Sequence, residues 1–158
     1  CYGMQLATIE FAQHVANIPN ANSVEIDSIT SDPVICVNPK QARNIKEKQM
    51  GATMRLGAYP CTLVKKSLSY RAYKQNKISE RHRHRYEFNN AYREVLEQAG
   101  MRFSGINEKD NLVEIIELPN HPWFVGTQFH PEFQSHPMQP HPLFRDFVAA
   151  ALRSQKKT

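Results

Sequence analysis

The chain has 158 residues, of which 41% are hydrophobic and 22% charged, as expected for one soluble globular domain with a core of its own. No apolar run approaches the roughly 20 residues of a membrane span, so we expect no membrane association. Three widely spaced cysteines do not form a disulfide framework, which favours a reducing, cytoplasmic location. The formal charge of +5 leaves a basic nucleic-acid module open.

The first stretch of the chain predicts a helix that begins directly after Cys1. Its apolar stripe is made of Leu6, Ile9, Ala12 and Val15. A thiol at a helix N-terminus is biased toward the thiolate by the positive end of the helix dipole. Gly3 would relieve crowding if the chain turned tightly into this helix, as in a nucleophile elbow.

Strand patterns dominate the middle of the chain. We expect strands over 33–37, 53–56, 61–64, 78–88, 101–106 and 112–118, the last two joined as a hairpin by the turn 107–111. Helices are expected over 91–99 and 142–153, with 67–74 ambiguous and 38–49 mainly loop. The stretch 154–158 reads as a flexible tail, so that residues 1–158 form one domain with its tail.

A His-x-Glu pair follows an apolar run late in the chain. The run 123–125 predicts a short buried strand, and Pro131 predicts a stiff turn after it. His130 and Glu132 are then spaced so that the carboxylate can orient the imidazole as a general base. With Cys1 as nucleophile, these are the groups that acyl transfer to a thiol requires. A second mechanism stays open, in which Cys1 at a true N-terminus uses its own α-amine as base.

The run Arg81-His82-Arg83-His84-Arg85 places three guanidiniums on one face of a strand. It could bind nucleic acid, bind a small anion, or be a solvated strand face. Nucleic-acid sites usually interleave aromatic side chains with the charges, and here aromatic residues only follow the run, so we expect no nucleic-acid partner. Apart from Glu80 and Glu87, no cysteine or carboxylate stands at ligand spacing from His82 and His84, and we expect no metal site.

Two short motifs resemble the triad motifs of the class I glutamine amidotransferases: Cys1-x-Gly3-x-Gln5 and His130-Pro131-Glu132. The stretch 50–57 is similar to a Gly-Gly-Thr-Met-Arg-Leu-Gly segment of the CTP synthase members, with Ala52 in place of a glycine. The run 80–87 matches the same members without a change, which counts against the runner-up, GMP synthase. The resemblance covers residues 1 to about 150 and points to the carboxyl-terminal part of a CTP synthase.

The resemblance implies an α/β fold, an open and mostly parallel sheet with flanking helices and β-hairpins. It implies that Cys1 is the nucleophile, His130 the acid-base and Glu132 its orienting carboxylate. It also implies that Gln5, Glu25 and Arg85 bind L-glutamine, with the Tyr2 amide as one oxyanion donor. Arg81 and Arg83 receive no role beyond pairing on the sheet.

Enzymes of this family hydrolyse glutamine through a thioester and pass the ammonia to a synthase domain. That domain aminates UTP with ATP and Mg²⁺, GTP activates the glutaminase half, and the full-length enzymes are homotetramers. No phosphate-binding Gly-Lys-Ser/Thr loop occurs in these residues, so we expect no cofactor in this segment. A catalytically inert amidotransferase-like binding module is the alternative to an enzyme.

The resemblance also implies that this is a partial domain. The amino-terminal strands and a glycine-rich oxyanion loop of the family would precede Cys1 and are absent here. Since the loss of one oxyanion donor costs about 100- to 1,000-fold in rate, we expect the 158 residues alone to be a poor glutaminase.

Overall fold

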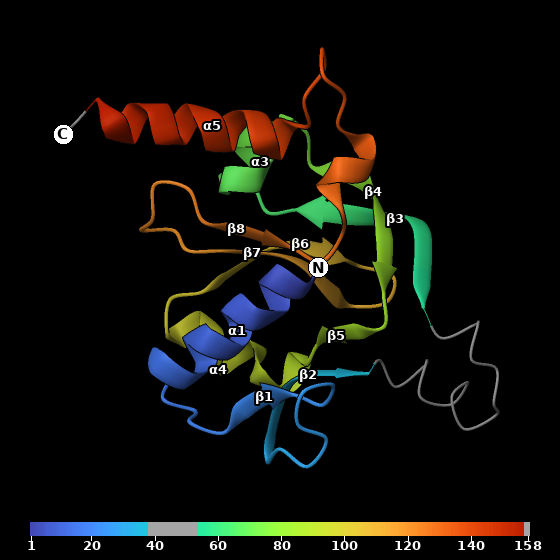
Figure 1. Cartoon of the computed structure of the whole chain (residues 1–158), viewed down its shortest axis with the longest axis vertical. Coiled ribbons are helices and arrows are strands. Elements are labelled where there is room, and N and C mark those ends of the chain that lie inside the picture. The colour runs from blue at the N-terminus through green and yellow to red at the C-terminus, as the bar shows by residue number, and fades with distance from the viewer. Residues whose placement is uncertain (38–53, 157–158) are drawn as a thin grey trace.

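The computed structural model describes residues 1–37 and 54–156, and the expected loop over 38–49 lies outside them (Figure 1). The first part holds α1 (Tyr2–His14), β1 (Ala21–Ser23) and β2 (Asp32–Val37). The middle holds β3 (Arg55–Leu63), α3 (Leu68–Tyr73), β4 (Lys77–His84), β5 (Tyr86–Phe88), η2 (Asn90–Tyr92) and α4 (Arg93–Gln98). The last part holds β6 (Arg102–Asn107), β7 (Leu112–Glu117), β8 (Val125–Thr127), η3 (Pro131–Gln134) and α5 (Pro142–Gln155).

The described strands form two sheets. One has the order β1-β2-β5, and the other has the order β4-β3-β6-β7-β8 with every neighbouring pair antiparallel. The α/β class is confirmed, but among these strands only β1 and β2 pair in parallel, so a mostly parallel sheet is not what they form. The physical reason is connection length, because short turns such as the one between β6 and β7 return the chain antiparallel.

The strand expected over 53–56 and the one over 61–64 are a single strand. β3 runs through Gly57 and Pro60 and pairs with β4 from Arg55 to Thr62. Gly57 adopts a positive φ of 95°, which a glycine tolerates without strain, so it does not end the strand as the sequence pattern suggested.

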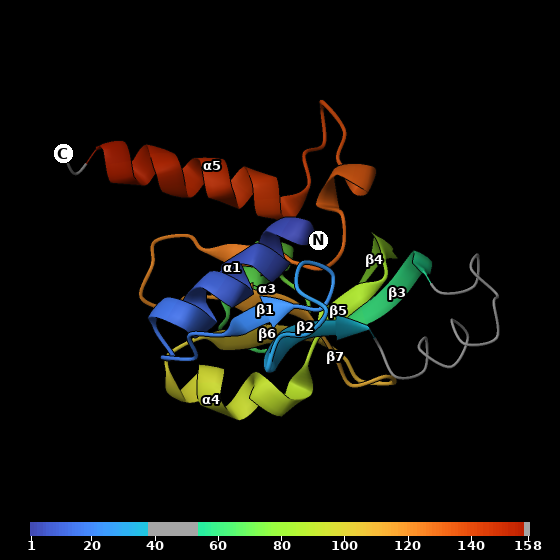
Figure 2. The same cartoon turned by 60° about the horizontal axis from the view of Figure 1, so that its bottom comes forward.

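Helix α1 and helix α4 lie on opposite sides of the strands (Figure 2). The helix expected after Cys1 is confirmed, but its buried face differs from the expected stripe. Leu6 and Val15 are 42% and 47% exposed, and the buried residues of α1 are Met4, Gln5, Thr8, Ile9, Phe11 and Ala12. A polar residue, Gln5, therefore takes a place in the core-facing surface of this helix.

Strand β7 is buried along its whole length because both of its faces are covered. Ile116 joins the core that includes residues of α1 and α4, whereas its neighbour Ile115 joins a second core with Phe129 and Leu143. Successive side chains of a strand point to opposite faces, so two adjacent isoleucines serve two cores. The predicted hairpin of β6 and β7 is confirmed.

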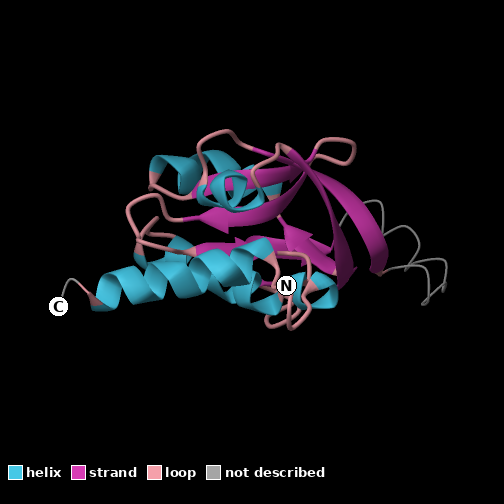
Figure 3. Ribbon diagram, turned by 90° about the horizontal axis from the view of Figure 1, so that it is seen from above, coloured by secondary structure: helices cyan, strands magenta, loops and turns pink. Residues whose placement is uncertain are grey.

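Helix α5 runs along one edge of the molecule and carries the carboxyl end away from the sheets (Figures 1 and 3). It includes Ser154 and Gln155, so the helix extends two residues into the expected tail, and Lys157 and Thr158 lie outside the described residues. Among the helices of the described ranges, none has both the length and the apolarity of a membrane span.

A buried charge cluster joins β3, β5 and β7. The Arg55 guanidinium donates to Glu114 at 2.8 Å and to Glu87 at 3.3 Å, and all three side chains are at most 5% exposed. One guanidinium cannot offset two carboxylates removed from water, and burial raises the pKa of Glu87 from its ordinary 4.5 to about 8. Between about pH 4.5 and pH 8, the Glu87 carboxyl is therefore protonated in the folded protein and ionised in the unfolded chain.

Substitution Gly105→Ala tests the packing between β6 and the second core. A Cβ at this position would lie 2.6 Å from Ile115 Cγ1 and 2.9 Å from Cys61 Sγ, so buried neighbours must shift. We expect a loss of about 1–3 kcal/mol in the free energy of unfolding, measured by denaturant titration. Gly3→Ala is the control, because no described atom lies within 4 Å of its added Cβ. Equal stabilities for the two variants would contradict this account.

Substitution Glu87→Gln tests the retained proton. A carboxyl whose pKa is raised on folding contributes stability below its unfolded pKa, and this contribution is lost as pH rises from about 4.5 to about 8. The neutral variant has no such loss, so between pH 5 and pH 8 its stability relative to wild type should rise by at least about 1 kcal/mol. The exposed Glu94→Gln on α4 should show no such trend, and parallel pH curves for Glu87→Gln and wild type would refute the assignment.

Candidate active site

Cys1 lies at the N-terminal end of α1 and at the edge of a pocket of about 300 Å³. The pocket is lined by Cys1, Tyr2, Gln5, Glu25, Met54, Arg83, His84, Arg85 and Tyr86. The candidate nucleophile and all four residues expected to contact glutamine thus line one cavity, although they come from segments up to 84 positions apart in the sequence. The volume is at the lower end of the range for small-molecule sites.

Three structural features bring the lining residues together. Cys1 and Gln5 are one helical turn apart, and the backbone N–H of Gln5 donates to the Cys1 carbonyl at 3.2 Å. Glu25 follows β1, where its N–H donates to the Ser23 hydroxyl at 3.1 Å. Arg85 stands between β4 and β5, where the chain leaves the five-stranded sheet and joins the three-stranded one. The pocket therefore lies at the junction of the two sheets.

The charges around the pocket are of both signs. The exposed Glu25 carboxylate supplies a negative group, and the Arg83 and Arg85 guanidiniums supply positive ones. A small zwitterion, such as a free α-amino acid, carries an ammonium and a carboxylate that match this pair of signs. The arrangement is thus suited to a free amino acid more than to a simple anion.

His130 and Glu132 lie outside the pocket lining but form the expected pair. His130 Nδ1 and Glu132 Oε1 are 2.6 Å apart. The other ring nitrogen, His130 Nε2, is shielded from solvent and has no hydrogen-bond partner among the described residues. Partial burial of Glu132 opposes its ionisation, but the hydrogen bond with His130, a backbone hydrogen bond and nearby positive charge together outweigh it and lower the pKa of Glu132. Pro131 starts the short helix η3 that sets this geometry, so the expected stiff turn is confirmed.

The segment 127–130 connects this pair to the thiol. The Cys1 nitrogen donates to the Thr127 carbonyl at 2.6 Å, and Gln128 Nε2 lies 3.5 Å from Cys1 Sγ. The His130 amide donates to the Arg81 carbonyl at 2.9 Å, which joins the pair to β4. In Figure 1 the chain from β8 to η3 passes beside the N-terminus. The contacts hold Cys1, His130 and the pocket in one region, as the sequence motifs implied.

Strand β4 alternates as expected, but it ends at His84, so the strand expected over 78–88 is divided and Arg85 lies outside it. Arg81 and Arg83 are exposed, whereas His82 and His84 are buried between them. Arg83 lines the pocket, a position that sequence reasoning assigned only to pairing on the sheet. The sequence also gave no indication that Gln128 contacts the Cys1 sulfur or that Tyr86 lines the pocket. The available signal for Gln128 was its place between the apolar run 123–125 and His130, where a buried polar side chain needs a partner.

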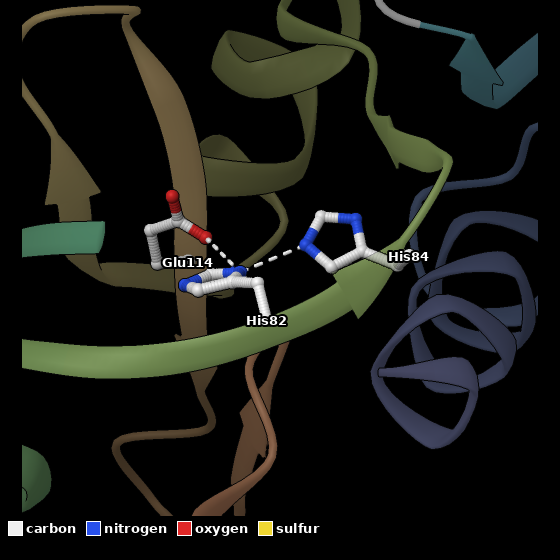
Figure 4. Close-up of side chains that lie close together, drawn as sticks. All are labelled: His82, His84 and Glu114. Carbon is white, nitrogen blue, oxygen red and sulfur yellow. Dashed lines mark hydrogen bonds and ion pairs between the residues drawn. The ribbon is translucent and has the colours of Figure 1, made fainter. Parts of the chain in front are cut away.

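The histidines of β4 meet an acidic residue that the sequence pattern did not place beside them. His82, His84 and Glu114 are buried, with possible ligand atoms within 4.8 Å of one another (Figure 4). His82 Nδ1 and His84 Nε2 are only 2.8 Å apart, a hydrogen-bond distance and shorter than the about 3.3 Å that separates two nitrogens on a tetrahedral zinc ion. Glu114 is already bound to Arg55. The geometry favours a hydrogen-bonded pair over a metal centre.

The chain resembles several known proteins. Residues 1–150 match the family described as glutamine amidotransferase class-I. A CTP synthase of Pelotomaculum thermopropionicum is 58% identical over 151 residues, which are 96% of this chain and 28% of that protein. A CTP synthase of Aquifex aeolicus is 54% identical over 99% of this chain and 29% of its own length. The chain thus spans little more than a quarter of these relatives.

Two solved structures share the fold. The glutaminase domain of Trypanosoma brucei CTPS, solved with bound acivicin, superposes with a TM-score of 0.86 at 38% identity over 96% of this chain and 58% of that one. A putative GMP synthase subunit from Thermoplasma acidophilum superposes with a TM-score of 0.50 at 17% identity over 68% of this chain and 50% of that one, a likeness of fold alone. Since the family match covers nearly the whole chain and the fold agrees with it, the chain belongs to the class I glutamine amidotransferases.

Proposed function

We propose that these residues form the glutamine-hydrolysing site of a CTP synthase. The observation that carries the proposal is the pocket in which Cys1, at a helix N-terminus, lies beside an acidic and a basic side chain suited to a free amino acid. The identity of 51–58% to proteins named CTP synthase supports this member of the family over GMP synthase. The complete Cys, His and Glu set supports an enzyme over an inert binding module.

Substrate binding follows from the charges of the pocket. Glu25 would bind the α-ammonium of L-glutamine and Arg85 its α-carboxylate, and Gln5 lines the same pocket one helical turn from Cys1. Fixing both charged groups of the amino acid directs its side-chain amide toward Cys1. Arg83, at the same pocket, adds to the positive potential that favours the carboxylate.

Hydrolysis would proceed in two steps. The Cys1 thiolate attacks the amide carbon, and the carbonyl oxygen takes up the negative charge as a tetrahedral intermediate. Tyr2 is the first residue of α1, so its N–H is among those without an acceptor inside the helix and can donate to this oxygen. His130 gives a proton to the departing ammonia, and a glutamyl thioester remains.

The second step returns the enzyme to its starting state. His130, now neutral, accepts a proton from a water molecule, and the hydroxide formed attacks the thioester carbon. The carbon–sulfur bond breaks, glutamate leaves, and the thiolate of Cys1 is restored. Glu132 holds His130 in the tautomer with a proton on Nδ1, and it stabilises the positive charge of His130 before the first step and again during the second.

The ammonia would serve the amination of UTP to CTP at the expense of ATP, the reaction that gives the named relatives their name. ATP, Mg²⁺ and UTP belong in this proposal to the part of those proteins that the chain does not match. The described residues do not fit Mg²⁺, which prefers an all-oxygen shell, because their one candidate ligand group is two imidazoles and a carboxylate. Activation by GTP, a homotetrameric assembly and a cytoplasmic location complete the proposal.

An electrophilic glutamine analogue tests the role of Cys1. We expect it to label Cys1 stoichiometrically in the full-length protein and to abolish ammonia release from glutamine, as followed by peptide mass spectrometry and an ammonia assay. Cys1→Ser should lower ammonia release by at least about 1,000-fold and keep the ability to use added ammonia. The buried Cys61→Ser is the matched control and should keep the label at Cys1. A label at any other residue would refute the assignment.

Glu25→Gln tests the zwitterion pocket. Loss of a charge-assisted hydrogen bond costs about 1.5–3 kcal/mol, so KM for glutamine should rise about 10- to 100-fold while kcat changes little. The exposed Glu108→Gln in the β6–β7 turn should leave both constants unchanged. Steady-state kinetics with glutamine distinguish the two outcomes, and an unaltered KM for Glu25→Gln would exclude the proposed ammonium contact.

A further inference from the structure

Gln128 is a completely buried amide that the mechanism above does not use. Its exposed fraction is 0%, and it lies directly after β8 and two residues before His130. Its backbone N–H donates to the Glu114 carbonyl at 2.8 Å, so its position is set by the neighbouring strand β7. A buried side-chain amide needs partners for both its oxygen and its nitrogen, and their identity reveals its role.

The side chain of Gln128 bridges two residues of the candidate site. Its Nε2 lies 3.5 Å from Cys1 Sγ, a normal N–H···S distance, and its Oε1 lies 3.4 Å from Gln5 Nε2. Cys1 directly precedes α1 and Gln5 lies within it, whereas Gln128 comes from 127 positions later in the chain than Cys1. One amide thus contacts the nucleophile and a residue of the substrate pocket at once.

The direction of these hydrogen bonds follows from the surrounding groups. Gln5 Nε2 also lies 3.1 Å from the Tyr86 carbonyl, which can only accept, so the nitrogen of the Gln5 amide must face it. The same nitrogen then donates to Gln128, which must present its oxygen to Gln5. The Gln128 NH₂ group is therefore turned toward the sulfur, and the reversed orientation would lose the contact with Gln5.

We propose that Gln128 is a positioning residue that donates a hydrogen bond to the Cys1 thiolate and couples it to Gln5. The inference rests on the proposed function, since it assigns the sulfur as the reacting atom. A hydrogen bond to the charged form of an acid stabilises that form. The donor adds to the field of the α1 N-terminus, and together they favour the nucleophilic thiolate before the substrate binds.

The alternative role for Gln128 is filling space in the core. A filler of this size would be apolar, because a buried amide gains little net free energy while its unsatisfied atoms are costly. Phe129, the next residue, takes the core position of this segment. The two roles differ in one measurable quantity, the pKa of the Cys1 thiol, which a filler does not alter.

Alkylation of Cys1 by iodoacetamide measures that pKa in the full-length protein. The rate at Cys1 is followed by peptide mass spectrometry between pH 5 and pH 10, which separates it from Cys36 and Cys61. Gln128→Met keeps the length of the side chain and removes the donor, and we expect it to raise the thiol pKa by about one unit, a tenfold lower rate below the pKa. Gln128→Glu replaces the donor by an acceptor and should raise the thiol pKa at least as much.

The control is Gln13→Met on the same helix. Gln13 Nε2 donates to the Ala21 carbonyl at 2.8 Å, so the same substitution removes one hydrogen bond of α1 away from the sulfur and should leave the thiol pKa unchanged. Folded Gln128 variants with the wild-type thiol pKa, or loss of folding in both, would overturn the proposal in favour of a structural role. Labelling of wild type by a glutamine analogue at a residue other than Cys1 would instead overturn the proposed function.

Discussion

The site depends on the hydrogen bond between the backbone N–H of His130 and the Arg81 carbonyl, because it joins the acid-base pair to the strand that lines the pocket. β4 carries pocket residues Arg83 and His84, and η3 carries Glu132. Gln134 strengthens the junction by donating to the Ser79 carbonyl and to Glu80. A rigid strand held at its backbone positions an imidazole more precisely than a free loop can. The distance between pocket and base is therefore set by main-chain contacts.

Beneath this junction the protein accepts a costly arrangement of buried charge. Arg55, Glu87 and Glu114 are removed from water with a single positive charge among them, and burial lowers the pKa of His82 to about 2 and of His84 to about 3. The neutral histidines pair with each other and with the Tyr86 carbonyl. Since that carbonyl also accepts from Gln5, the buried cluster orients the Gln5 amide, which contacts Gln128 beside the thiol. The buried charge cluster therefore lowers the stability of the core but fixes the orientation of polar side chains at the site.

Local patterns predicted much of the fold and several of the site residues. The β6–β7 hairpin, α5 and the His130–Glu132 pair follow from turn residues, helical spacing and Pro131, which act over a few positions. The stripe of α1 was misjudged because a polar residue, Gln5, occupies its buried face, and periodicity counts only apolar residues. β3 was divided in two because a glycine weakens a strand and was taken as its end, whereas β3 continues through Gly57.

The sequence by itself determined the kind of chemistry: a cysteine before a helix, a histidine held by a glutamate, and the motifs shared with the amidotransferase family. Only the tertiary structure decided which side chains share a pocket, which buried groups keep a proton, and that Gln128 contacts the sulfur. The physical reason is that residue type and spacing report interactions within one element. Pairings between distant segments arise from packing two sheets and α1 together, and no local pattern records them.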